Sequence, residues 1–173
     1  MLSEGVSGTP MPGVEVSGTV ALTAGDVSKA TVVLTTATID GVANAYGYVA
    51  GENDYVAQVG ADGTWKLDIV PQGTYTMLIR KPGALYYQKN SFTVGTEAIT
   101  YKLVTLPVGD LDVDGTVEFS DLMLLIGERN YGKPVTDDGV LTIADFDDDG
   151  TIAFSDLMLL IGARNYTMTA HIE

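Results

Sequence analysis

The sequence predicts a multidomain β + α chain. An N-terminal antiparallel β-sandwich over residues 15–106 precedes a small all-α module with two loop–helix motifs over residues 107–173. Three observations predict this fold class. Short apolar runs between turn residues fill the first part, and a duplicated acidic-loop-plus-apolar-helix segment fills the second. Charge also divides the chain, because residues 1–106 carry 9 acidic and 6 basic side chains, whereas residues 107–173 carry 14 and 3.

Residues 1–14 lack the basic start and apolar stretch of a signal peptide, so we expect a leader left from a longer polypeptide. From residue 14 onward, period-2 alternation and β-branched residues predict strands separated by Asp-Gly and Pro-x-Gly turns. Trp65, Leu67 and Ile69 are expected on one face of their strand. The predicted strands are Val14–Leu22, Ala30–Thr36, Tyr46–Val49, Asp54–Val59, Thr64–Val70, Thr74–Ile79, Tyr86–Val94 and Ile99–Leu106.

One stretch of this half, Asp62 to Met77, joins an Asp-Gly turn, a strand and a Pro-x-Gly turn into the next strand. It resembles the carboxypeptidase regulatory-like and related immunoglobulin-like sandwich domains of bacterial surface proteins. The resemblance implies an immunoglobulin-like sandwich, a kind of domain that seldom carries out catalysis.

An internal duplication follows the sandwich. Asp110–Tyr131 and Asp145–Tyr166 are identical at 17 of 22 positions, at an offset of 35 residues. Each copy opens with D-x-D-x-D-G and has aspartate at position 12, the pattern of a twelve-residue calcium loop. Alternate side chains supply carboxylate oxygens, position 7 supplies a main-chain carbonyl, and glycine at position 6 folds the loop. The predicted ligands of two Ca2+ ions are Asp110, Asp112, Asp114, Thr116 and Asp121 in the first loop and Asp145, Asp147, Asp149, Thr151 and Asp156 in the second.

A solvated acidic turn is the alternative to a metal site. Three aspartates within five residues would repel one another without a cation, and the same arrangement occurs twice. Magnesium is less favoured than calcium, because it demands tight octahedral geometry and retains its waters. Position 9 is Glu118 in the first copy and Ala153 in the second, so we expect unequal calcium affinities.

The loops lack the entering helix of an EF-hand. Strand, proline and glycine precede Asp110, and the connector Gly132–Ala144 before the second loop is short and contains proline and glycine. Two loop–helix repeats with aspartate at position 12 and a D-L-x-L-L helix resemble the dockerin module of cellulosome proteins, over about 107–166. A β-sandwich placed directly before them, with no flexible linker, further resembles the X-module–dockerin pair of cellulosomal scaffoldins.

This resemblance implies a partner and a location. The partner would be a cohesin domain of a cell-surface anchoring protein or of another scaffoldin, and the X-module would stabilise the dockerin. The protein would be secreted and held at the bacterial cell surface.

The helix of each repeat carries five consecutive apolar residues, more than one buried stripe needs. We expect Leu122, Leu125 and Leu124 in a small core. The other helix face would be exposed to a partner. The alternative for Phe119 and Met123 is that they fill the core. In dockerins, loop positions 10 and 11 and the following helix contact cohesin. Phe-Ser at positions 10 and 11 of both loops implies a hydrophobic, charge-poor interface and does not decide which type of cohesin is bound. The duplication allows two binding orientations. The predicted contacts are Phe119, Ser120, Met123, Ile126, Gly127, Asn130, Phe154, Ser155, Met158, Ile161, Gly162 and Asn165.

Composition argues against other classes of function. The chain has a net charge of −14 and no cluster of basic residues, which disfavours nucleic acid, and its apolar runs are too short for membrane insertion. It has no cysteine, and its single histidine, His171, is expected in a tail, so neither an enzyme site nor a small-molecule substrate is predicted. Asp137 and Asp138 lie in a short polar connector, which disfavours a glycosidase pair. The alternative to cohesin docking is a calcium-stabilised surface spacer or adhesion module of an extracellular bacterial protein without a dedicated cohesin partner.

Overall fold

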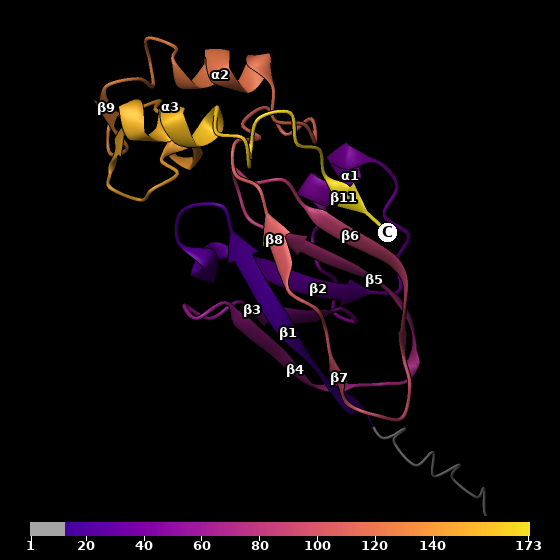
Figure 1. Cartoon of the computed structure of the whole chain (residues 1–173). Helices are drawn as coiled ribbons and strands as arrows, with labels where there is room; N and C mark the ends of the chain where they lie inside the picture. Colours follow the sequence, from indigo (N-terminus) through magenta and orange to yellow (C-terminus); the bar gives the residue numbers. More distant parts are fainter. Residues whose placement is uncertain (1–12) are drawn as a thin grey trace, which may run out of the picture.

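The computed structural model describes residues 13–173, and its framework is built from β-strands (Figure 1). The strands are β1 (Val14–Leu22), β2 (Thr31–Thr35), β3 (Tyr55–Gln58), β4 (Thr64–Val70), β5 (Gly73–Arg80), β6 (Tyr87–Val94), β7 (Ile99–Thr100), β8 (Val104–Leu106), β9 (Lys133–Pro134), β10 (Thr151–Ile152) and β11 (His171–Ile172). In one sheet, β1 pairs antiparallel with β4 and parallel with β7 and β8. The other large sheet has the order β11-β6-β5-β2-β3, and β9 pairs with β10.

The two large sheets bury their facing side chains in a sandwich. Val16 and Trp65 from the first sheet and Leu34 and Ile79 from the second belong to one cluster of buried residues. Along β1 and the first part of β4, buried and accessible positions alternate, as expected for strands with one face on the core. Apolar burial between the sheets is therefore the main source of stability for this part of the chain.

The strand predictions are confirmed for most of the sandwich, with two differences. The run Ile99–Leu106 divides into β7 and β8, which pair with successive parts of β1. The predicted strand Tyr46–Val49 is wrong, because Val42–Gly47 forms the helix α1. This helix packs Ala45 against a second buried cluster that contains Leu78 and Tyr86. These long-range contacts outweigh the β-propensity of the local sequence.

The expected position of Ile69 is also wrong. Trp65 and Leu67 are buried, but Ile69 is 69% exposed and Val70 is fully buried instead. A bulge between β1 and β4 explains the change, since Val14 pairs with Val70 whereas Val16 pairs with Leu67. One extra residue in β4 reverses which side chains face the core.

The prediction of a separate all-α module is wrong. Within residues 13–173 the α-helices are only α1, α2 (Phe119–Leu125) and α3 (Phe154–Leu160), each of six or seven residues, with short 3-10 turns at Val27–Lys29 and Thr142–Ala144. The C-terminal segment adds β9, β10 and β11, and β11 pairs with β6 of the sandwich. The chain is therefore mostly β and forms a single sandwich-like unit.

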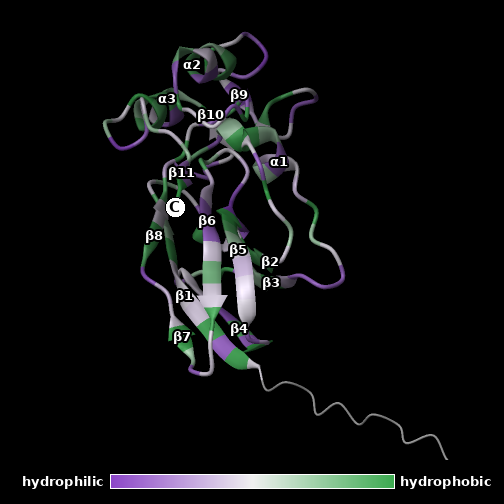
Figure 2. Cartoon of the chain, turned by 90° about the vertical axis from the view of Figure 1, so that its right-hand side faces the viewer, coloured by the Kyte–Doolittle hydropathy of each residue, from purple (hydrophilic) through white to green (hydrophobic). Residues whose placement is uncertain are grey.

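Packing explains why the C-terminal segment is not independent. Helices of seven residues are too short to be stable alone. Leu125 of α2 and Leu160 of α3 are fully buried, and they belong to the same cluster as Val16 and Trp65 of the sandwich. Figures 1 and 2 show α2 and α3 side by side beyond one end of the sandwich.

The predicted limits of the three segments, residues 1–14, 15–106 and 107–173, stay predictions. Most of the expected leader, residues 1–14, lies outside the described residues, and Val14 already opens β1. The boundary between residues 106 and 107 falls directly after β8, but buried side chains on both sides of it share one core.

Candidate metal centre and helical face

Each duplicated loop gathers three carboxylates. Asp110, Asp112 and Asp114 offer oxygens that lie within 4.8 Å of one another, and loop positions 1, 3 and 5 of the second copy do the same. Glycine at position 6 has a positive φ in both copies, 88° at Gly115 and 92° at Gly150. A residue with a side chain is strained in this conformation, so glycine is what lets the loop fold back over its carboxylates.

The aspartates at position 12 are held at the start of the two helices. Asp121 Oδ2 accepts from the Glu118 amide at 2.8 Å, and its Oδ1 accepts from the Leu111 amide at 2.6 Å. Asp156 makes the same bonds in the second copy. Neither carboxylate belongs to the three-carboxylate group of its loop. Position 12 therefore ties the start of the loop to the helix N-terminus.

The carbonyls at position 7 point away from the strand pairs that hold each loop. The carbonyls at positions 6 and 8 accept from residues 167–170 in the first copy, both at 2.8 Å, and from residues 132–135 in the second, at 3.0 and 2.7 Å. Successive carbonyls of an extended chain point to opposite sides. We therefore expect those of Thr116 and Thr151 to be directed away from these partners.

Asp110 provides the strongest sign that a cation fits. Its side chain is fully buried, and Oδ1 has no hydrogen-bond partner. Burial raises the pKa of Asp110 to about 6, although Tyr46 and the Gly115 amide donate to Oδ2. A buried carboxylate oxygen without a donor is unfavourable, and a bound dication would supply the missing partner.

The same effect extends to three other predicted ligands. Burial is the main cause of a raised pKa at Asp121, Asp145 and Asp156, and neighbouring carboxylates add to it. Backbone amides lower these pKa values only in part. Two loops that concentrate partly buried negative charge in this way favour a hard cation with oxygen ligands.

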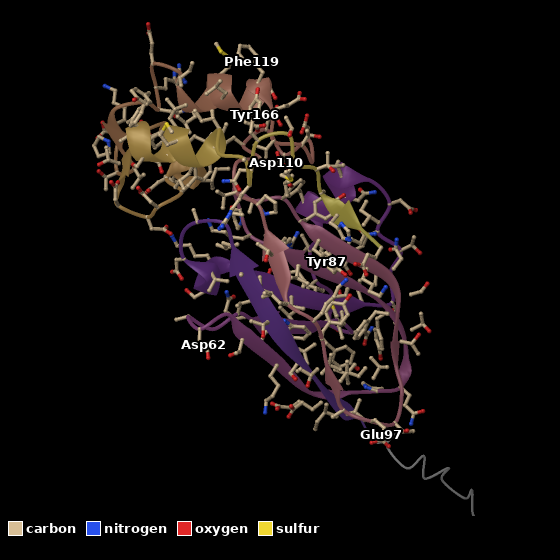
Figure 3. The ribbon with its side chains drawn as sticks, in the orientation of Figure 1. Asp62, Tyr87, Glu97, Asp110, Phe119 and Tyr166 are labelled. Atoms are coloured by element: carbon tan, nitrogen blue, oxygen red, sulfur yellow. The ribbon has the colours of Figure 1, made fainter. Side chains whose placement is uncertain are left out.

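The two helices leave apolar side chains exposed. Phe119 and Phe154 are 62% and 63% exposed at equivalent positions. Figure 3 shows Phe119 at the outer edge of α2, on the side away from the sandwich. We define the helical face as the exposed apolar side chains of α2 and α3 and the residue after each: Phe119, Met123, Leu124, Ile126, Phe154, Met158 and Ile161.

Other predicted partner contacts lie elsewhere. Asn130 and Asn165 are buried, and their amides donate to the Leu124 and Leu159 carbonyls, both at 2.6 Å. They fasten the end of each helix, so we leave them out of the helical face. Leu124, expected in the core, is partly exposed and belongs to this face.

The small residues of the predicted contact set occupy distinct environments. Ser120 has a buried hydroxyl without a partner, whereas Ser155 is exposed. Gly127 and Gly162 do not lie inside helices, because α2 and α3 end at Leu125 and Leu160. A Cβ at either glycine would meet only carbonyl atoms of its own helix within 4 Å, so no other element requires glycine there.

The sandwich contributes residues that sequence reasoning missed. Tyr46 of α1 donates to Asp110 in the first loop, and Lys29 pairs with Asp148 at position 4 of the second. Position 4 has a left-handed backbone in both copies, with φ 58° at Val113 and 59° at Asp148. The copies differ at this position, with valine in the first and aspartate in the second, and that difference is the sequence feature that could have pointed to the Lys29 contact.

Solved structures of one kind of complex share this fold. Two of the matching chains come from an N-terminal and a C-terminal interface mutant of a type II cohesin–X-dockerin complex from Acetivibrio cellulolyticus. Each match has a TM-score of 0.65 and 20% identity, and covers 91% of this chain and 98% of the other. At that identity the likeness establishes the fold alone. No protein-family model matches the chain, and no curated protein does.

The structure also bears on membrane association. Among residues 13–173, no helix has the length and apolar character needed to cross a membrane. The longest helices there, α2 and α3, have seven residues each.

Proposed function

We propose that this chain is a non-catalytic, calcium-dependent docking module, the X-module–dockerin pair of a cellulosomal scaffoldin, which binds a cohesin domain outside the cell. Two Ca2+ ions would be held by the carboxylates of the two loops and by the Thr116 and Thr151 carbonyls. The sandwich would act as the X-module. Residues 107–173 would act as dockerin repeats packed on it, not as a separate helical module.

The observation that carries this proposal is the pairing of acidic loops with an exposed apolar face. Each loop ends in the first turn of α2 or α3, where its position-12 aspartate accepts backbone amides at both ends of the loop. A cation that draws the loop carboxylates together would therefore fix the direction of each helix. Seven exposed apolar side chains on two adjacent short helices are typical of a protein-binding surface.

Calcium would act through structure in this proposal. The ion neutralises the loop carboxylates, and the buried Oδ1 of Asp110 gains a partner. The ordered loops then hold α2 and α3 in the arrangement that a cohesin would contact. Metal binding and the integrity of the helical face are therefore coupled.

The test is binding to a panel of cohesin domains that includes type II cohesins, measured by calorimetry with the full chain. We expect calcium-dependent binding that EGTA abolishes. Met123→Asp combined with Met158→Asp should weaken it at least 100-fold, because it places charge in a desolvated apolar interface. Ile69→Asp is the control, since Ile69 is also apolar and exposed but lies on β4 of the sandwich.

The outcomes separate the two candidate functions. Retained binding in the double variant would refute the helical face as the contact surface. Calcium binding without any cohesin partner would favour the calcium-stabilised spacer.

A further inference from the structure

The first acidic loop touches the sandwich through the short helix α1. The Tyr46 hydroxyl donates to Asp110 Oδ2, the residue at loop position 1. A Cβ at Gly115 would come within 3.0 Å of Val42, so the loop backbone lies directly against the start of α1. Loop and helix are distant in the sequence, and only the fold brings them together.

Tyr46 is held rigidly in the position that this hydrogen bond needs. Its ring packs edge-on against Tyr86 of the second buried cluster, with 5.1 Å between the ring centroids. Arg80, at the end of β5, donates to the carbonyls of Ala45 at 3.1 Å and of Tyr46 at 2.8 Å. The guanidinium satisfies carbonyls at the helix C-terminus and thereby fixes α1 to the sheet. The hydroxyl is therefore presented to Asp110 by α1, which Arg80 fixes to β5.

Asp110 depends on this contact more than its counterpart does. It is fully buried, with Oδ1 unpartnered and Oδ2 bonded only to Tyr46 and to the Gly115 amide. Asp145, at position 1 of the second loop, accepts only backbone amides of its own loop, from Asp149 at 3.1 Å and Gly150 at 3.0 Å. No side chain of the sandwich bonds to Asp145 among the interactions of the described residues.

From these contacts we propose that the sandwich completes the first calcium site: the Tyr46 hydroxyl orients Asp110 Oδ2 and leaves Oδ1 directed at the ion. Tyr46 is a positioning residue, because it touches a ligand and not the metal. The inference rests on the proposed function, since it requires that the loops bind calcium. It makes the two sites unequal for a reason outside the loops, because a sandwich side chain bonds to a predicted ligand in the first loop, whereas in the second the sandwich pairs with Asp148, which is not a predicted ligand.

The test is calorimetric calcium titration of the full chain after chelation, with Tyr46→Phe compared to wild type. Phenylalanine keeps the ring packing on Tyr86 and removes only the hydroxyl. We expect one of the two sites to weaken 10- to 100-fold, the usual effect of losing a hydrogen bond to a metal ligand, and the other to change less than twofold. Asp112→Asn and Asp147→Asn assign the sites, because each removes a predicted ligand from one loop.

Tyr48→Phe is the matched control. Its hydroxyl bonds to Thr35 at 2.8 Å and Asp54 at 2.6 Å, neither of which is a predicted ligand, so both affinities should match wild type. Equal affinities in Tyr46→Phe and wild type would overturn the inference and leave the calcium sites standing. Equal weakening of both sites would also overturn it, because that is the effect of a general loss of structure. Absence of calcium binding in wild type would instead refute the proposed function.

A second measurement uses the unmodified protein. In an NMR titration of labelled wild-type chain, the amides of α1 should shift as the first site fills and stay constant as the second fills. If the amides of α1 did not respond to calcium binding in the first loop, the inference would be overturned even if the phenylalanine variant failed to fold.

Discussion

Removal of calcium should lower the stability of the whole chain, because the acidic loops and the sandwich share one core. Carboxylates within 4.8 Å of one another repel by at least about 0.9 kcal/mol per pair in water, so the three in each loop cost about 2.6 kcal/mol or more and the two loops roughly 5 kcal/mol. Mass action gives the same size of effect. Free calcium at 100 times the dissociation constant contributes about 2.7 kcal/mol per site.

This free energy converts into a measurable shift of the melting temperature. A domain of this length moves about 2–4 °C per kcal/mol, so calcium should raise the Tm by about 10–20 °C over a chelated sample. Differential scanning calorimetry of the full chain, in calcium and in EGTA, measures the shift and the number of transitions. Magnesium at the same concentration should give a smaller shift, because its coordination suits these loops less well.

Two results would refute this reasoning. A Tm that differs by less than about 2 °C between calcium and EGTA would mean that the loops do not bind the ion strongly enough to relieve their repulsion. Two separate transitions, with the sandwich unaffected by calcium, would mean that the C-terminal segment unfolds on its own. In that case the shared burial of Leu125 and Leu160 would not couple the two parts.

Three further predictions address the core, the symmetry and the C-terminal strand. Leu160→Ala should cost about 2–5 kcal/mol in urea unfolding, because the side chain is fully buried; an unchanged midpoint would contradict the shared core. Gly127→Arg and Gly162→Arg should each preserve cohesin binding, and only the double variant should abolish it, if the repeats offer two orientations; loss in one single variant would establish one orientation. The pKa of Glu173 is lowered to about 2, chiefly by Lys102, so its stabilising effect exists above its unfolded pKa of about 4.5 and disappears as the pH falls toward 2. Glu173→Gln should therefore melt below wild type at pH 6, and the difference should become much smaller by pH 2; a pH-independent difference would contradict this pairing.

Some elements followed from local sequence, and others did not. The alternation in Val14–Leu22 and Thr64–Val70 predicted two strands with the bounds of β1 and β4, because one buried face imposes a period of two. The same alternation placed Ile69 in the core, since a bulge is set by how two strands pair. The strand expected at Tyr46–Val49 did not form, and its first two residues lie in α1 instead, because tertiary contacts outweighed local propensity.

The candidate site also has features that the local sequence predicted and features that it did not. The repeated D-x-D-x-D-G pattern predicted which carboxylates would gather, because spacing along a short loop fixes which side chains converge. It did not predict that Asn130 and Asn165 would be buried at the helix ends, or that α2 and α3 would be only seven residues long.

The sequence by itself determined most strands of the sandwich, the duplicated acidic loops and the apolar character of the helices, because these depend on residues close together in the chain. Only the tertiary structure decided that residues 107–173 share the core of the sandwich and that Tyr46 reaches Asp110. The physical reason is that two short helices cannot bury enough apolar surface alone, so their placement depends on a surface made by distant residues.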